Sequence, residues 1–270
     1  EFRRERHTAD PHLAGAGVPS GTKRGDTACC CGNRTEGTMV KAVLFDLGNT
    51  LAEYFESCAY PELLPRCIEE AGAFLKQMGF GSIREGELCR AVEAENWEEA
   101  DHRVRPLEER LLSIFQVRSF SAPHREDLCR AFMKPIFEMG QLYDDTAPFL
   151  RELRRKGLKI GIVSNAPWGC PAPLCHEEAT RLGLPELADA IVFCTDVGWR
   201  KPAREIFDYT LAKLAVSADQ CLFVGDHPEW DLSGPRALGM AAVLLDRRGT
   251  RNVAGEHVLR ELIELRFPDD

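Results

Sequence analysis

The sequence predicts an α/β fold: a doubly wound, Rossmann-like parallel sheet with an all-helical domain inserted near its start. Short β-branched and apolar runs alternate with segments of helical periodicity, as in parallel sheets covered by helices. Residues 46–158 separate the first run from the second, far more than one crossover helix needs. This excess indicates an inserted domain.

The predicted strands each end next to a polar residue. Because parallel strands end at one edge of an open sheet, these polar side chains should converge there, although they lie far apart in the sequence. The predicted strands are residues 40–45, 159–163, 191–194, 221–224 and 241–245, and the polar residues that follow are Asp46, Ser164, Thr195 with Asp196, Asp226 and Asp246.

The insert has apolar residues at three- and four-residue spacing, which predicts helices at 62–78, 85–100, 106–115 and 124–140. A further helix at 149–155, closed by Gly157 as its C-terminal cap, leads into the second strand. The expected domains are a core of residues 39–53 and 143–270 and a helical cap of residues 54–142. Residues 1–38 lack apolar periodicity and are expected to be a disordered or vector-derived leader.

Composition narrows the function classes. The 270 residues include 43 acidic and 34 basic ones, and the formal net charge of −9 argues against a nucleic-acid partner. No apolar run approaches the roughly 18 residues that cross a bilayer, so no membrane role is expected. The 11 cysteines are scattered and no signal peptide is evident, which predicts reduced thiols in the cytoplasm.

Four segments could carry chemistry, although each alone has a plain structural interpretation such as a turn aspartate, a helix cap or a solvated lysine. In chain order they are Val43-Leu44-Phe45-Asp46-Leu47-Gly48-Asn49-Thr50-Leu51, Ile162-Val163-Ser164-Asn165, Arg200-Lys201-Pro202 before a predicted helix at 203–214, and Val224-Gly225-Asp226-His227-Pro228-Glu229-Trp230-Asp231. Together, and in this order, they resemble the four motifs of the haloacid dehalogenase-like (HAD) hydrolases, phosphatase type. The resemblance extends over residues 40–265 and includes a cap after the first motif.

The resemblance implies a chemistry and a site. Asp46 would attack phosphorus to form an aspartyl phosphate, Ser164 would bind a phosphoryl oxygen, and Lys201 would balance the developing charge. Mg²⁺ would be held by Asp46, the Gly48 carbonyl and Asp226. Gly48, Asn49 and Asn165 would contact the substrate, a small phosphorylated molecule. Asp231 would orient Lys201 or a metal-bound water, or else cap the following helix.

One residue departs from the family pattern. Most family phosphatases carry an aspartate two residues after the nucleophile, where it protonates the leaving oxygen; here that residue is Gly48. Metal binding is unaffected, because it uses the carbonyl of this residue. The expected function is an Mg²⁺-dependent phosphomonoesterase that is a monomer or homodimer, and two alternatives remain. One is a non-catalytic or regulatory relative. The other is a metal-free 2-haloacid dehalogenase, whose relatives typically have Tyr after the nucleophile and Asn at the Asp226 position.

Overall fold

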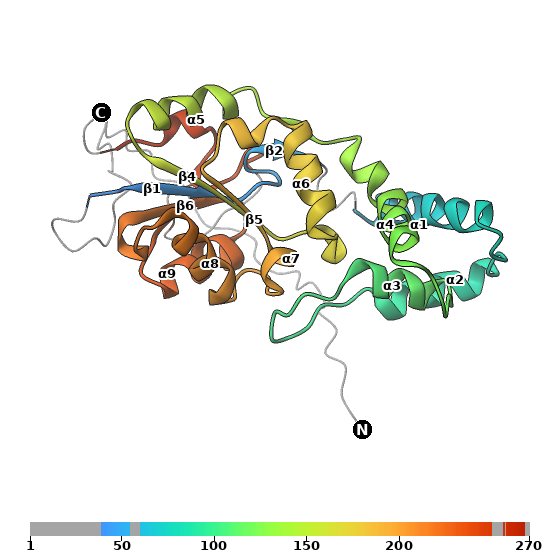
Figure 1. Ribbon diagram of the computed structural model, residues 1–270. Helices are drawn as coiled ribbons and strands as arrows, with labels where there is room; N and C mark the ends of the chain where they lie inside the picture. The colour runs from blue at the N-terminus through green and yellow to red at the C-terminus, as the bar shows by residue number, and fades with distance from the viewer. Residues whose placement is uncertain (1–38, 55–59, 250–255, 257, 268–270) are drawn as a thin grey trace, which may run out of the picture.

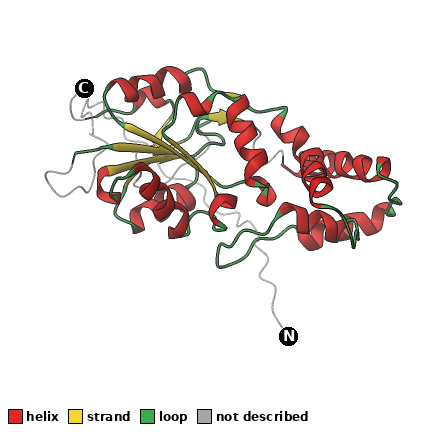
Figure 2. Cartoon of the chain, in the orientation of Figure 1, coloured by secondary structure: helices red, strands yellow, loops and turns green. Residues whose placement is uncertain are grey.

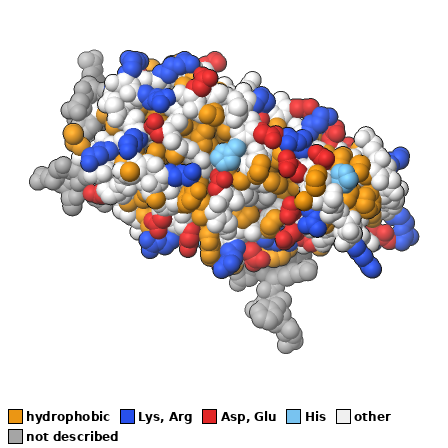
Figure 3. All heavy atoms as spheres, viewed as in Figure 1, with side chains coloured by type: hydrophobic (Ala, Val, Ile, Leu, Met, Phe, Trp, Pro, Cys, Tyr) orange, Lys and Arg blue, Asp and Glu red, His pale blue; other side chains and the backbone are white. Residues whose placement is uncertain are grey.

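The computed structural model describes residues 39–54, 60–249, 256 and 258–267 (Figure 1). The expected leader, residues 1–38, lies outside these residues. The chain forms two parts side by side, with the sheet in one and helices α1 to α4 in the other (Figures 1 and 2). Acidic and basic side chains are mixed over both parts on the face in Figure 3. No helix in the described ranges is long and apolar enough to cross a membrane.

The larger part is built on a six-stranded sheet in the order β5-β4-β1-β6-β7-β8, and every neighbouring pair is parallel. The predicted α/β fold class is thereby confirmed. The strands are β1 (Ala42–Phe45), β4 (Lys159–Ser164), β5 (Ala190–Phe193), β6 (Cys221–Gly225), β7 (Ala241–Leu245) and β8 (Val258–Leu259). Sequence analysis missed β8, because a two-residue strand is too short to show a period.

Helices cover both faces of the sheet. In Figure 1, α5 lies on one face while α8 and α9 lie on the other. Their bounds, with those of the neighbouring elements, are α5 (Thr146–Arg155), α6 (Ala172–Arg181), α7 (Cys194–Val197), α8 (Arg204–Leu214), α9 (Gly234–Ala237), η2 (Pro167–Gly169), η3 (Leu184–Glu186), η4 (Ala218–Gln220), η5 (Pro228–Ser233) and η6 (Leu262–Glu264). Cys194, expected to end a strand, instead begins α7. Gly157 has a φ of 77°, as its predicted capping role requires.

The smaller part contains α1 (Tyr60–Gln77), α2 (Glu85–Glu95), α3 (Leu107–Ile114) and α4 (Ala122–Phe137). Their apolar faces are buried against one another, with Cys67, Leu111 and Phe132 fully buried. The prediction that the second helix reaches residue 100 was wrong. Helix α2 ends at Glu95 because Arg105 donates hydrogen bonds to the carbonyl oxygens of Glu95 and Trp97, which turns the chain back toward the core.

A two-stranded antiparallel pair lies where the chain leaves the core and returns. It joins β2 (Ala52–Glu53) to β3 (Gln141–Leu142). Sequence analysis expected no strand here. Behind the pair, the Thr146 hydroxyl donates to the Leu51 carbonyl oxygen at 2.7 Å, and Arg247 donates to the Thr50 carbonyl oxygen. These bonds fix the segment that follows β1. The expected domain limits at residues 54 and 142 stay predictions.

Candidate active site

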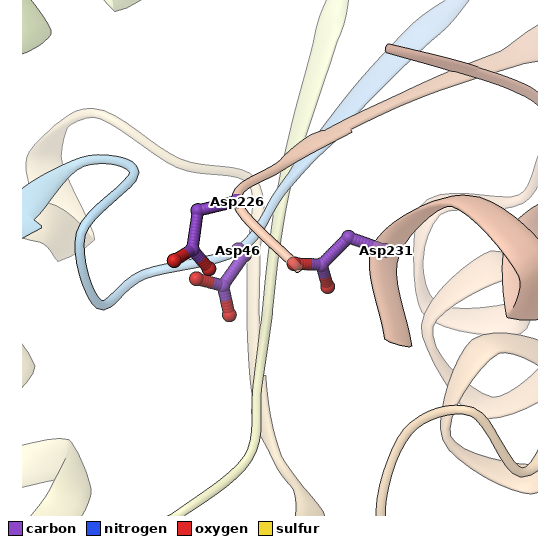
Figure 4. A group of neighbouring side chains, drawn as sticks. All are labelled: Asp46, Asp226 and Asp231. Atoms are coloured by element: carbon purple, nitrogen blue, oxygen red, sulfur yellow. The ribbon is translucent and has the colours of Figure 1, made fainter. Parts of the chain in front are cut away.

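The polar residues at three neighbouring strand ends come together as the sheet topology predicts. Asp46 follows β1, Ser164 ends β4 and Asp226 follows β6, and β1 lies between the other two strands. The Asp46 amide donates to the Val224 carbonyl oxygen at 2.9 Å, which holds the two loops together. Carboxylate oxygens of Asp46, Asp226 and Asp231 all lie within 4.8 Å of one another. Figure 4 shows these three side chains clustered at the sheet edge.

Lys201 lies at the centre of this cluster. Its ammonium group donates to Asp46 Oδ1 at 2.6 Å and to Asp231 Oδ1 at 2.7 Å, and its side chain is only 1% exposed. The Asn165 side chain fixes the Lys201 backbone, accepting from the Lys201 amide at 2.8 Å and donating to its carbonyl oxygen at 3.2 Å. The Asn165 amide, expected to contact substrate, is thus engaged in positioning Lys201.

The buried charges shift one another's ionisation. Burial raises the pKa of Asp46 to about 6, an effect that neighbouring Asp231 reinforces and Lys201 opposes. For Lys201, burial acts to lower the pKa, but the attraction of Asp231 and Asp46 outweighs it and raises the pKa above its ordinary value. Lys201 is therefore fully charged at neutral pH.

Asp231 is placed to orient Lys201. It lies in η5, is 1% exposed, and uses its second oxygen, Oδ2, to accept from the His227 amide at 2.9 Å. Both carboxylate oxygens are thus engaged by protein donors. Oδ1 thus binds Lys201, and Oδ2 binds the His227 amide at the start of η5. That Asp231 orients Lys201 or a metal-bound water, or caps the following helix, stays a prediction.

The loop after Asp46 supplies groups around the carboxylate. Thr50 donates from its hydroxyl to Asp46 Oδ2 at 3.3 Å, a contact that sequence analysis missed. Asn49 has a left-handed backbone (φ 59°), and its buried Oδ1 accepts no hydrogen bond from a described residue. Gly48 is not left-handed, and a Cβ there would meet only the Tyr54 ring, at 3.9 Å. A side chain at position 48 is therefore sterically allowed.

The site opens into a cavity of about 470 Å³. Asp46, Asn49, Ser164 and Asp226 lie in its wall, together with residues from the insert and from the motif-two loop. On one side, the Tyr54 hydroxyl donates to Glu178 Oε1 at 3.3 Å, and Arg181 binds both Glu178 oxygens at 2.7 Å. The wall also includes Glu98, Phe137, Trp168, Arg200 and Trp230. Sequence analysis assigned no site role to these residues, although Arg200 and Trp230 lie within the third and fourth motif segments, because no local period marks a cavity wall.

The charges of the cluster fit a divalent cation. Three carboxylates converge in a largely buried site, and the Lys201 ammonium group binds two of them, Asp46 and Asp231. Carboxylates gathered in this way favour a bound cation. Carboxylate and carbonyl oxygens are the ligands that Mg²⁺ prefers. Asp46, Gly48 and Asp226 line the cavity and Asp231 does not, so the groups suited to hold the ion are Asp46, Asp226 and the Gly48 carbonyl.

Comparison with known proteins identifies the family. Residues 40–239 match the family described as haloacid dehalogenase-like hydrolase. The chain belongs to the haloacid dehalogenase-like hydrolases. It is 30% identical over 162 residues to a phosphatase of Mycobacterium tuberculosis, which covers 60% of this chain and 70% of that protein. It is 28% identical over 213 residues to a ribulose-1,5-bisphosphate 5-phosphatase of Halopiger xanaduensis, covering 77% and 85% of the two chains.

Solved structures agree with this assignment. A HAD phosphatase from Thermococcus onnurineus superposes with a TM-score of 0.59 at 26% identity, over 84% of this chain and 96% of that one. A 2-haloacid dehalogenase from Pseudomonas syringae has a TM-score of 0.60 at 22% identity and the same coverage, which shows a shared fold. With the phosphatase-named relatives, these findings make this HAD-like protein a hydrolase of the phosphatase type.

Gly225 provides a test of how Asp231 positions Lys201. A Cβ at this glycine would overlap the Asp231 side chain, so Gly225→Ala should displace Asp231 and loosen its hold on Lys201. We expect kcat/KM for an aryl phosphate to fall about 10-fold or more, since small displacements of catalytic groups can cost about 100-fold. Circular dichroism and thermal melting would verify that the variant is folded.

The control is Gly161→Ala in β4. A Cβ there would press on the Leu214 and Leu44 side chains at 3.0 and 3.2 Å, away from the charged cluster. Its cost should appear as lower stability with near-normal kcat/KM. Equal activities in the two variants would show that Asp231 does not position Lys201.

Proposed function

We propose that the protein is an Mg²⁺-dependent phosphomonoesterase that hydrolyses a small phosphorylated metabolite through an aspartyl-phosphate intermediate. The observation that carries the proposal is the Asp46 carboxylate in the cavity wall, hydrogen-bonded by Lys201 and Thr50 and accompanied by Asp226. The curated relatives support the substrate class, because they include phosphatases named for phosphoserine, glyceraldehyde 3-phosphate and phosphoglycolate.

In the first step, an Asp46 carboxylate oxygen forms a bond to phosphorus while the ester P–O bond breaks. Lys201 compensates the negative charge of Asp46 and of the phosphoryl oxygens that approach it. The Ser164 hydroxyl donates to a phosphoryl oxygen. Water then attacks the phosphorus of the aspartyl phosphate, which releases inorganic phosphate and restores the carboxylate.

Asp46, Asp226 and the Gly48 carbonyl would hold the metal ion. When bound, Mg²⁺ supplies positive charge that draws the anionic phosphoryl group and the carboxylate together. Asp231 stays outside this ligand set, because it does not line the cavity that Asp46, Gly48 and Asp226 line. Its contribution is to hold Lys201 against Asp46.

The alternatives find less support. A dehalogenase of this family typically has Tyr after the nucleophile and Asn in the fourth motif, whereas this chain has Leu47 and Asp226. A non-catalytic role finds less support because curated relatives that the chain matches are named as phosphatases. Oligomeric state and cytoplasmic location stay predictions.

The nucleophile is tested by Asp46→Asn. An amide cannot form the acyl phosphate, so phosphatase activity should fall below about a hundredth of the original while the fold is kept. The matched control, Asp208→Asn, removes an exposed carboxylate on α8 and should leave the rate unchanged. Steady-state kinetics with an aryl phosphate measures both. Activity of Asp46→Asn above that level would remove Asp46 from the nucleophilic role.

The metal site is tested by titrating Mg²⁺ into Asp226→Ala. The loss of a ligand should raise the Mg²⁺ concentration for half-maximal activity much more than the KM for substrate. Asp231→Asn should shift the titration less, because that side chain engages Lys201 rather than the ion. EDTA should abolish wild-type turnover. An unchanged Mg²⁺ curve for Asp226→Ala would refute this assignment.

The glycine at position 48 predicts that kcat/KM depends steeply on the leaving group of the ester. Without an acid at this position the departing oxygen leaves unprotonated, so kcat/KM should fall steeply as leaving-group pKa rises. Aryl, acyl and anomeric sugar phosphates should be good substrates and simple alkyl phosphates poor ones. A series of esters with graded leaving-group pKa measures the slope.

Gly48→Asp should restore the acid, since the backbone and the Tyr54 ring leave room for a side chain. It should accelerate alkyl phosphates more than aryl phosphates, while Gly48→Asn, of equal size and without an acidic proton, should not. A flat dependence in the wild type, with chemistry rate-limiting, would mean that another residue donates the proton.

A further inference from the structure

Arg200 is the only lysine or arginine among the described residues that line the cavity. It immediately precedes Lys201 and lines the same cavity as Asp46. Lys201 itself is committed to two carboxylates. Arg200 is therefore the cationic side chain of this wall that can bind the leaving group of a phosphate ester.

The Arg200 guanidinium has unused hydrogen-bonding capacity. It carries five N–H donors, yet its side chain donates no hydrogen bond to any described residue, and its buried Nε makes an ion pair without a hydrogen bond, with Glu98 Oε2 at 3.5 Å. Only 15% of the side chain is exposed. A buried N–H donor without a hydrogen bond is costly, and more so when it belongs to a charged group. This arrangement indicates an anionic acceptor supplied by a ligand.

The nearby carboxylate does not neutralise this charge. Glu98 lies 3.5 Å from Arg200 through Oε2, but its Oε1 pairs more closely, at 2.7 Å, with Arg110. Arg110 is 1% exposed and lies behind the wall. One carboxylate thus serves two guanidinium groups, and the triad keeps a net charge of +1 that faces the cavity at Arg200.

The backbone holds Arg200 in place. Its amide donates to the His102 carbonyl oxygen at 2.8 Å, and the Val104 amide donates to the Gly198 carbonyl oxygen at 3.0 Å. In Figure 1 the loop before α3 reaches back toward α7, which places these two segments side by side. The backbone that carries Arg200 is thus fixed before a ligand arrives, which reduces the entropic cost of binding.

We infer that the substrate's leaving group carries a carboxylate that Arg200 binds. The inference rests on the proposed phosphomonoesterase activity and narrows its substrate to phosphorylated hydroxy acids or phenolic acids. A planar guanidinium matches a carboxylate with two parallel hydrogen bonds. The single excess positive charge suits a monoanionic carboxylate better than a phosphate dianion, because Glu98 stays within reach of the bound group.

The test compares esters that differ only in this charge. One pair is 3-carboxyphenyl phosphate and its carboxamide; a shorter pair is phosphoglycolate and its amide. The carboxylate and the amide of each pair are nearly equal in size. Charge-assisted hydrogen bonds contribute about 1.5–3 kcal/mol, so wild-type kcat/KM should favour the carboxylate by about 10-fold or more in at least one pair.

Substitutions of Arg200 then test whether this residue causes the preference for the carboxylate. In Arg200→Gln the ratio of carboxylate to amide should fall to about one, whereas Arg200→Lys, which keeps the charge and loses the fork, should retain part of it. A purely structural effect on neighbouring Lys201 would lower both esters equally and leave the ratio unchanged. Arg103→Gln is the control, because Arg103 is 65% exposed, stacks on Trp199 and does not line the cavity; its ratio should equal that of the wild type.

Two outcomes would overturn the inference. One is Asp46-dependent hydrolysis of phenyl phosphate with no preference for the carboxylate in either pair; the proposed phosphatase function would then survive without it. The other is an unchanged preference in Arg200→Gln. If no ester is hydrolysed, the proposed function fails, and calorimetric binding of the same pairs to the wild type and to Arg200→Gln still decides the role of Arg200. Equal affinity for carboxylate and amide would then exclude it.

Discussion

The buried ion pairs of Lys201 are the interaction on which the site depends. An ammonium group at 1% exposure is tolerated only because Asp46 and Asp231 accept its hydrogen bonds at 2.6 and 2.7 Å. Removing one partner of such a group typically costs about 3–5 kcal/mol, since a buried charge is left uncompensated. The lysine therefore ties together the end of β1, the turn η5 and the segment before α8, and Asn165 adds the end of β4 through the Lys201 backbone.

This anchoring also couples the insert to the chemistry. The segment that carries Lys201 is bound on its other side by residues of the loop before α3, through the backbone bonds of Arg200 with His102 and of Gly198 with Val104. Glu98 adds an ion pair from the same loop. A displacement of the insert would thus act directly on the residue next to the lysine. This loop is therefore a physical link between the insert and the segment that carries Lys201.

Much of this site could be predicted because it lies at strand ends. The apolar runs before Asp46, Ser164 and Asp226 are local patterns, and the parallel topology converts their ends into neighbours. The ion pairs of Lys201 needed the family resemblance, since no strand precedes it. Tyr54 and Glu178 could not be found, because they meet only when α6 packs against the core. Arg200 lies beside Lys201 in the third motif, but only the packing of the chain places it in the cavity wall. The end of α2 likewise depends on a hydrogen bond from Arg105, ten residues away.

The structure also bears on what replaces the missing acid at Gly48. Tyr54 packs beside this glycine, but burial and neighbouring Glu178 raise the pKa of Tyr54 well above its ordinary value, so it is a poor proton donor. Both oxygens of Glu178 in turn accept hydrogen bonds from Arg181, and Oε1 also accepts from Tyr54. Neither group is suited to protonate a departing oxygen. Lys201 thus places positive charge beside Asp46 and Arg200 places it in the cavity wall, while neither Tyr54 nor Glu178 supplies the acid that is missing at Gly48.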